Sequence, residues 1–369
     1  MDIEQLIKKH LNFYSQNKKF DLNKLIPLKQ AVKLLHLNTN FVCPVINIAG
    51  TNGKGSCLAI LQAIYLKAGY KVASFSSPHL LKFNERINFN GQNIANEILL
   101  EYLIKIKDIC VNLKLNYFQV ALLIALMFFN DNKAHILILE AGLGGQWDAT
   151  NIIDADITIL TSISLDHCEI LGYDRTSIAL EKLSISRNNN IIICGDPKPP
   201  KIIYEYAKKY NNDLYNLDKD FFIKTINING NLGYEFYYQQ VRICSYYKMN
   251  LVPNNIASSL MAVTLLQSFF AIDKKFITEA IKNVRVWGRC EVIKKQPLII
   301  VDVAHNPSSI KFLFQTVTKL KTDNAKIYVL LAIAKEKDLS AIIKEFSLPI
   351  NQLSLVSMQD NTMRTAEQI

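Results

Sequence analysis

The chain has 369 residues, of which 50% are hydrophobic and 20% charged, so it is long enough to bury a large core and to form two domains. A formal net charge of +10 suits anionic ligands, and would also suit nucleic acid, but lysine and arginine are scattered and no nucleic-acid recognition module is present. The seven cysteines lie far apart without a Cys-x-x-Cys pair, which argues against a disulfide framework or a zinc site and indicates a reducing compartment.

The N-terminus and the apolar segments predict neither a targeting signal nor a membrane span. Met1–Glu4 lacks the basic-then-apolar layout of a signal peptide. The longest apolar run, Val120–Phe129, is much shorter than the roughly 20 residues that a spanning helix needs, so we interpret it as a buried helix. We therefore expect a cytoplasmic protein without a membrane partner.

A helical N-terminal stretch is followed by an apolar strand, Pro44–Ile48, and a glycine-rich turn. The turn reads Gly50-Thr51-Asn52-Gly53-Lys54-Gly55-Ser56. Glycine allows backbone angles that let N–H groups converge on an anion, and a helix predicted over Ser56–Lys67 adds its positive N-terminal end. Lys54 supplies a cation for the outer phosphates and Ser56 a hydroxyl for Mg²⁺. Although Gly55 stands where the common pattern has Ser or Thr, the turn predicts a nucleoside triphosphate site.

Strands and helices alternate beyond this turn, which predicts a mainly parallel sheet covered on both faces. The expected strands are Lys71–Phe75, His135–Glu140, Ile157–Ile163 and Asn190–Cys194, and the expected helices are Asn96–Leu113, Phe118–Asn130 and Arg175–Ile185. Ligands of such sheets gather at the carboxyl ends of the strands. We therefore expect the turn, Ser77, Glu140 and His167 to share one edge of the sheet.

The pattern changes after residue 220, where Phe221–Tyr247 has the short, alternating, Tyr-rich segments of an antiparallel insertion. Two helices, a hinge and three further strands are then expected: Asn255–Phe270, Lys275–Val284, Val286–Arg289, Pro297–Val303, Ala325–Ala332 and Gln352–Ser357. We predict an α/β protein with two domains. Residues 1–287 would form a P-loop ATPase domain on a parallel sheet, and residues 288–369 a smaller, Rossmann-like α/β domain.

Several strings occur in order along the chain: Ala49–Ser56, Ser76–Leu80, Leu139–Gly145, Asp148–Asn151, Thr161–His167 and Asp302–Pro307. Together they resemble the motifs of the Mur-ligase superfamily, and within it the folylpolyglutamate synthase and dihydrofolate synthase branch. The resemblance extends from about Phe20 to the end of the chain. Members of this family continue for several more elements, so we expect the C-terminal domain to be shortened, as a fragment or as a reduced protein.

The resemblance implies an ATP-dependent ligase that adds L-glutamate to dihydropteroate, to folates or to both. ATP would activate the carboxylate as an acyl phosphate, and the protein would mainly position groups and neutralise charge. We expect a monomer that requires Mg²⁺. Two alternatives stay open, namely a cell-wall Mur ligase acting on a nucleotide-linked peptide and a degenerate protein that binds ATP or folate without turnover.

The resemblance also assigns metal ligands, with Ser56 on a first Mg²⁺ and Ser77, Glu140 and His167 on a second. Glu140 ends an apolar strand, where a carboxylate is costly to bury unless it is paired or metal-bound. A strand-end acid that faces water is the alternative. By themselves, Ser77 would be a turn residue before Pro78, and His167 a helix cap or a core histidine.

Three further contacts with the nucleotide are implied, from Asn255, Arg289 and Asp302 on the far side of a cleft. His305, just after a predicted strand, is expected to line the cleft and to act in catalysis beside Lys54. Lys182 matches the position of a carbamylated lysine, in which added CO₂ turns a cation into a carboxylate. An exposed helix lysine is the alternative for Lys182.

On the acceptor side, the resemblance implies contacts from Phe118, Gln119, Gln146 and Asp148. Phe118 would stack on a flat heterocycle, with a core position as the alternative. Gln119 stands where the family has an acid, and Gln146 where it has arginine. Both departures affect the pterin side and leave the ATP motifs intact.

Overall fold

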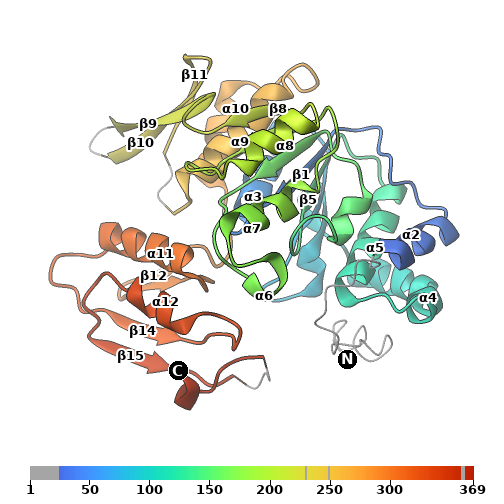
Figure 1. Ribbon diagram of the computed structural model, residues 1–369. Helices are drawn as coiled ribbons and strands as arrows, with labels where there is room; N and C mark the ends of the chain where they lie inside the picture. Colours follow the sequence, from blue (N-terminus) through green and yellow to red (C-terminus); the bar gives the residue numbers. More distant parts are fainter. Residues whose placement is uncertain (1–24, 229–230, 248–249, 359–361) are drawn as a thin grey trace. The chain divides into compact units, whose positions relative to one another are not determined.

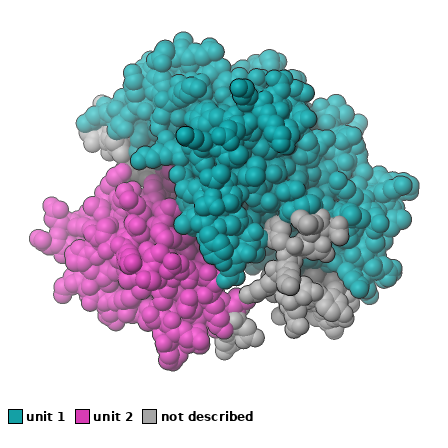
Figure 2. Space-filling model, viewed as in Figure 1, with its two compact units in different colours: residues 1–248, 253–285 teal, residues 249–252, 286–369 magenta. Residues whose placement is uncertain are grey.

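The computed structural model describes residues 25–228, 231–247, 250–358 and 362–369. The chain divides into unit 1, residues 1–248 and 253–285, and unit 2, residues 249–252 and 286–369 (Figure 2). The first described helix is α2 (Leu25–Leu34). The predicted helical stretch before it, and the start of the resemblance at Phe20, lie outside the described residues.

An eight-stranded sheet with the order β4-β3-β2-β5-β1-β6-β7-β8 forms the centre of unit 1 (Figure 1). The strands are β1 (Val45–Ala49), β2 (Val72–Phe75), β3 (Ile87–Phe89), β4 (Gln92–Asn93), β5 (Ile136–Glu140), β6 (Ile157–Leu160), β7 (Ile191–Cys194) and β8 (Asp213–Asn216). Along this order, the neighbouring strands β2, β5, β1, β6, β7 and β8 pair in parallel. At the edge of the sheet, β3 pairs antiparallel with both β2 and β4. Every residue of β1 and β5 is buried, as expected for parallel strands covered on both faces. The predicted parallel sheet is confirmed.

Helices cover both faces of this sheet (Figure 1). One face carries α2, α4 (Asn96–Asn112), α5 (Tyr117–Asp131), α7 (Arg175–Leu183) and α8 (Ile202–Lys209), which bury alternate residues such as Val45, Leu137 and Leu160. The other carries α3 (Lys54–Lys67), α9 (Pro253–Leu265) and α10 (Lys274–Asn283), and both α9 and α10 pack against α3. Residues Val120–Met127 of α5 are all buried, which confirms the predicted buried helix. Among the described residues, no helix has the length and apolar character that a membrane crossing requires.

A three-stranded antiparallel sheet follows β8, as predicted. It consists of β9 (Phe221–Ile228), β10 (Asn231–Tyr238) and β11 (Val241–Tyr246), with β10 in the middle. Cross-strand aromatic pairs stabilise it: the rings of Phe222 and Tyr237 are stacked with centroids 5.0 Å apart.

Unit 2 contains two small sheets rather than one. β12 (Glu291–Lys295) and β13 (Leu298–Val301) form an antiparallel hairpin, and β14 (Tyr328–Leu331) pairs in parallel with β15 (Gln352–Leu355). The helices are α11 (Pro307–Leu320), α12 (Leu339–Lys344) and the short η3 (Ala366–Gln368), with Ile310, Phe314 and Ile342 in the core. Strand β12 was not predicted from the sequence, because Glu291–Lys295 does not alternate between apolar and polar residues and four of its five residues are exposed.

Candidate active site

The glycine-rich loop joins β1 to α3 and is held by the segment after β6. The N–H of Thr51 donates to the carbonyl of Ser162 at 2.7 Å, and the Thr51 hydroxyl donates to the carbonyl of Ser164 and accepts from its N–H, both at 3.0 Å. α3 begins at Lys54, two residues earlier than predicted, so Ser56 lies within its first turn and is buried. The loop and the N-terminus of a 14-residue helix therefore form the anion-binding arrangement that the sequence predicts.

Two glycines of the loop have conformations that a side chain would disturb. Gly50 has φ +146°, and a Cβ atom added to it would lie 1.7 Å from Oγ1 of Thr161. Gly53 has φ +94°, and its added Cβ would lie 2.3 Å from Nδ2 of Asn255. Asn255 belongs to α9 in unit 1 and contacts the loop directly, so its predicted place on the far side of a cleft is wrong.

Replacing Gly50 with alanine is expected to destabilise unit 1 by about 2–5 kcal/mol, the sum of overpacking and backbone strain. Gly69→Ala is the matched control, since Gly69 has φ +87° but nothing within 4 Å of the added Cβ. Gly69→Ala should therefore show only the cost of backbone strain. Urea unfolding of both variants measures the difference, and equal free energies of unfolding would contradict the close approach of Gly50 to Thr161.

Glu140, at the end of β5, places a buried carboxylate beside the loop. Its side chain is 5% exposed, and Oε2 accepts from the N–H of Ser77 at 3.2 Å. A Cβ built on Gly55 would lie 3.5 Å from the same oxygen, so the loop backbone is within van der Waals reach of the carboxylate. Because Mg²⁺ prefers oxygen ligands, this carboxylate beside the loop is chemically suited to such an ion.

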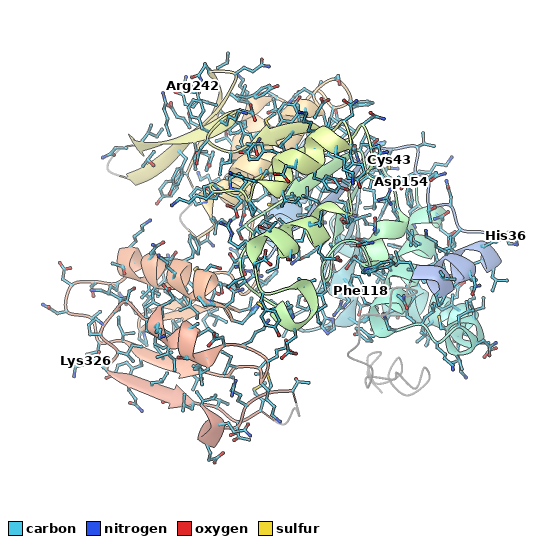
Figure 3. All side chains as sticks on the ribbon, in the orientation of Figure 1. His36, Cys43, Phe118, Asp154, Arg242 and Lys326 are labelled. Atoms are coloured by element: carbon cyan, nitrogen blue, oxygen red, sulfur yellow. The ribbon has the colours of Figure 1, made fainter. Side chains whose placement is uncertain are left out.

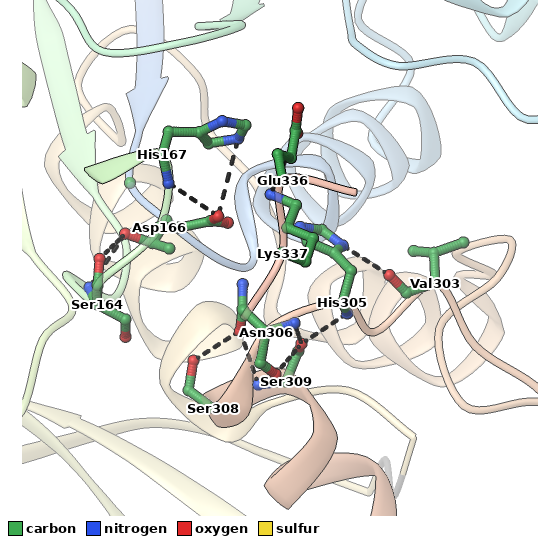
Figure 4. Close-up of polar contacts among 12 residues, drawn as sticks. Ser164, Asp166, His167, Val303, His305, Asn306, Ser308, Ser309, Glu336 and Lys337 are labelled. Carbon is green, nitrogen blue, oxygen red and sulfur yellow. Dashed lines mark hydrogen bonds and ion pairs between the residues drawn. The ribbon is translucent and has the colours of Figure 1, made fainter. Parts of the chain in front are cut away.

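His167 lies after β6, the strand next to β1, and precedes the short helix α6 (Cys168–Leu171). Its backbone is left-handed, with φ +50°, and its N–H donates to Oδ1 of Asp166 at 3.0 Å. The ring atom Nε2 lies 4.0 Å from the same oxygen (Figure 4). In the described part of the chain, no group of three His, Cys, Asp or Glu side chains is placed so that it could hold a metal ion.

Lys182 of α7 is buried under the glycine-rich loop. It is 4% exposed, and its Nζ donates to the carbonyl of Gly50 at 2.8 Å. Burial, and then the nearby charge of Lys54, lower the pKa of Lys182 from 10.5 to about 7. The Nζ of Lys54 lies 3.2 Å from the same carbonyl of Gly50. The alternative of an exposed helix lysine is therefore excluded, and burial favours the neutral amine, the form that reacts with CO₂.

Asp148 and Gln146 belong to the turn that follows β5. The buried carboxylate of Asp148 accepts from the N–H groups of Gly142, Leu143 and Thr150 at 2.8, 3.0 and 2.9 Å. Burial raises its pKa, and these hydrogen bonds oppose the rise. The backbone of Gln146 donates to Glu181, while its side chain is exposed. We interpret Asp148 as a residue that shapes the turn rather than one that touches an acceptor.

Phe118 and Gln119 start helix α5. Gln119 is 5% exposed, and its side chain accepts from the N–H of Asn116 at 3.0 Å while Asn116 accepts from the N–H of Gln119, which makes a capping box. The Phe118 ring, labelled in Figure 3, lies 5.4 Å from that of Phe75 and against the backbone of Gly142. Gln119 thus caps the helix, and Phe118 packs between β2 and the turn after β5.

The remaining predicted residues lie in unit 2, before and at the start of α11. Asp302 accepts from the N–H groups of Cys290 and Ala304, both at 2.6 Å, and so fixes the backbone beside Arg289. The Nδ1 of His305 lies 2.8 Å from the carbonyl of Val303 (Figure 4). Asp302 and His305 therefore lie on one short segment of unit 2, whereas Asn255 belongs to unit 1.

An ion pair that fixes the segment carrying His167 was not predicted from the sequence, and it joins the buried Asp196 to the partly exposed Arg175. Oδ2 of Asp196 accepts from the N–H of Ile163 and from Arg175, each at 2.8 Å, and Nε of Arg175 donates to the carbonyl of Ile163 at 2.8 Å. Both backbone groups of Ile163 are therefore bound. Asp196 follows the apolar strand β7, so the rule that found Glu140 and His167 would also have found it.

Replacing Arg175 with alanine should lower the ligase activity that the resemblance implies by about 10- to 100-fold, the usual cost of removing a residue that orients a metal site. The loss should appear as a higher Mg²⁺ requirement, because the segment holding Thr51 and His167 would shift. Arg242→Ala removes the exposed partner of Glu235 in β10 and serves as the control. An unchanged Mg²⁺ dependence in Arg175→Ala, measured by steady-state kinetics, would contradict this positioning role.

The fold and the site define a class of protein: a phosphate-loop α/β unit joined to a smaller α/β unit. A family profile described as "Mur ligase, glutamate ligase domain" matches residues 288–369. The dihydrofolate synthase/folylpolyglutamate synthase of Buchnera aphidicola from Acyrthosiphon pisum is 35% identical over 365 residues, covering 99% of this chain and 84% of the relative. The Escherichia coli protein of that name is 30% identical over 329 residues, or 88% and 75% of the two chains. The chain belongs to the dihydrofolate synthase/folylpolyglutamate synthase family.

Solved structures of this family share the fold. The chain matches E. coli FolC in complex with DHPP and ADP with a TM-score of 0.90 at 28% identity, covering 100% of this chain and 86% of that one. It matches a bifunctional folylpolyglutamate synthase/dihydrofolate synthase with Mn, AMPPNP and L-glutamate bound with a TM-score of 0.85 at 28% identity, covering 97% and 84%. The predicted fold class and family are confirmed.

Proposed function

We propose that this chain is an ATP-dependent ligase that forms an amide bond between L-glutamate and dihydropteroate, a folate, or both. The products are ADP, phosphate and the glutamylated acceptor. The observation that carries the proposal is the convergence of the glycine-rich loop, buried Glu140 and buried Lys182 at one edge of the sheet, in a chain of this family. These residues are suited to a triphosphate and its counter-ion.

The chemistry requires activation, because a free carboxylate resists attack by an amine. Transfer of the γ-phosphoryl group of ATP to the acceptor carboxylate gives an acyl phosphate, and the glutamate amine then displaces phosphate. The N–H groups of the loop and Lys54 would hold the transferring phosphates in place. Ser56 on a first divalent cation, and Ser77, Glu140 and His167 on a second, would neutralise charge that develops on the phosphoryl oxygens.

The other site residues complete the proposal. Asn255, against Gly53, would contact the nucleotide from within unit 1, and Arg289, Asp302 and His305 would supply contacts from unit 2. Phe118 would line the acceptor site. Lys182, when carbamylated, would present a carboxylate to the metal-binding region. We propose that the protein is a monomer in the cytoplasm.

A product assay tests the function directly. The purified chain is incubated with Mg²⁺-ATP and radiolabelled L-glutamate, in parallel with dihydropteroate and with tetrahydrofolate. Labelled folate product together with ADP supports the proposal and identifies the acceptor. Nucleotide binding without ADP release would instead support the non-catalytic alternative, and full activity in EDTA would contradict the metal requirement. Sedimentation of the same sample tests the monomer.

A further inference from the structure

A cavity of about 700 Å³ opens in unit 1, at the edge of the sheet opposite to the glycine-rich loop. Three of its lining residues lie at the starts of strands. Pro44 and His135 directly precede β1 and β5, and Tyr70 lies two residues before β2. Ser77 and Glu140 lie at the carboxyl ends of two of these strands. Parallel strands have all their amino ends at one edge, so this amino-edge cavity is separate from the proposed ATP site.

The floor of the amino-edge cavity is aromatic. Phe129 and Phe270 are 3% and 5% exposed, and the rings of Phe270 and Tyr70 meet edge-on with centroids 4.8 Å apart. Small-molecule sites typically have volumes of about 300–1,000 Å³ and apolar walls with a few polar groups. Such a floor suits a flat ring.

The rim carries positive charge. Lys133 and His135 line the cavity and are exposed, and Lys133 makes no ion pair among the described residues. Nδ1 of His135 accepts from the N–H of Lys71 at 3.0 Å, so the neutral ring carries its proton on Nε2 as a donor. The adjacent acid Asp131 accepts a hydrogen bond from the Tyr102 hydroxyl. The rim thus offers two donors suited to an anionic group.

We propose that the amino-edge cavity binds a small aromatic anion. Its ring packs on Tyr70, Phe129 and Phe270, and its carboxylate or sulfonate lies between Lys133 and His135. An apolar ligand without charge leaves the two donors unused, and an inorganic anion leaves the aromatic floor uncovered. The ligand class therefore follows from both halves of the lining together.

The first test uses 8-anilinonaphthalene-1-sulfonate as the probe and the full chain as the protein. Fluorescence titration should give saturable binding that is about tenfold weaker, or more, in the double variant Lys133→Ala/His135→Ala. Lys107→Ala, which removes an exposed lysine of α4 outside the cavity, is the matched control and should bind as the unmodified chain does. Circular dichroism checks that all three are folded. Equal affinity in the double variant, or displacement of the probe by Mg²⁺-ATP, overturns the proposal.

A thiol supplies a second, independent readout. Cys43, labelled in Figure 3, lines the cavity and is half-buried. Cys168 at the start of α6 is also half-buried and is not part of the lining. Saturating probe should slow the alkylation of Cys43 by iodoacetamide and leave that of Cys168 unchanged, as followed by peptide mass spectrometry. Burial raises the pKa of the Cys43 thiol, so the reaction is run at alkaline pH. Unchanged alkylation of Cys43 means that the probe binds elsewhere and overturns the site.

Discussion

Replacing Lys54 with alanine is expected to lower glutamate ligation by about 100- to 1,000-fold, the usual cost of removing one preorganised group that stabilises developing charge. The ammonium group of Lys54 lies 3.2 Å from the Gly50 carbonyl and 3.5 Å from that of Thr51, at the loop that would hold the phosphates. Steady-state kinetics with Mg²⁺-ATP measures the loss, and thermal unfolding shows whether the fold persists.

The same helix provides a matched control. Lys67 is at the other end of α3, where it forms an exposed ion pair with Glu279 at 2.8 Å. Lys67→Ala should therefore retain ligation, because exposed ion pairs contribute little and this one is remote from the loop. Lys54→Arg keeps the charge but replaces a compact ammonium with a planar fork, so it should rescue little activity. Full turnover in Lys54→Ala would refute the assignment of the loop.

Replacing Lys182 with methionine is expected to abolish ligation and, at the same time, to raise the stability of the folded chain at neutral pH. The folded-state pKa of Lys182 is about 7, below its usual value of 10.5, chiefly because burial penalises its charged form. Each unit of pKa corresponds to about 1.4 kcal/mol, so the cost of this lysine is on the order of several kcal/mol. Methionine has a similar volume and carries no charge. Part of the gain is offset because the Gly50 carbonyl loses a donor.

The pH dependence gives this prediction a definite sign. Between the folded-state pKa of about 7 and the unfolded-state value of 10.5, the unfolded chain binds more protons at Lys182 than the folded chain does. Lys182 therefore makes the free energy of unfolding rise with pH across that window. Below the window, its cost to stability is largest and no longer changes with pH. Lys182→Met should remove this slope, whereas Lys208→Met on the exposed face of α8 should keep it. Urea unfolding in CO₂-depleted buffer from pH 6 to 10 measures both slopes.

Carbamylation of Lys182 is tested with the same variants. After incubation with ¹³C-bicarbonate, the unmodified chain and Lys208→Met should show a carbamate resonance that Lys182→Met lacks. The buried neutral amine is the form that reacts with CO₂, so the signal should fade as the pH drops below about 7. A carbamate signal that persists in Lys182→Met would place the modification elsewhere.

Much of the site was predictable because local sequence encodes local geometry. The run from Val45 to Ser56 specifies a strand, a glycine turn and a helix, and these three alone predict phosphate binding. Polar residues just after apolar strands, such as Ser77 and Glu140, were predicted at one edge, and the hydrogen bond between them joins residues 63 positions apart. Periodicity predicted a mainly parallel sheet, although it misplaced strand and helix ends by one to several residues.

Side-chain roles were less predictable, because they depend on what packs nearby. Gln119 was predicted to contact the acceptor substrate, and in the structure its side chain caps α5 together with Asn116. Asp148 was predicted to contact the same substrate, and in the structure its carboxylate accepts hydrogen bonds from backbone N–H groups of its own turn. Asn255 was predicted on the far side of a cleft, but its helix α9 packs on α3 and places Asn255 beside Gly53.

The sequence by itself determined the phosphate loop, the parallel sheet and the family, because these depend on neighbours along the chain and on the period of apolar residues. Only the tertiary structure decided that Lys182 is buried against Gly50, 132 residues away, and that Asp196 and Arg175 hold the segment before His167. The physical reason is that burial and desolvation arise between elements brought together by folding. They change the pKa and the hydrogen-bond partners of a side chain without leaving a local pattern in the sequence.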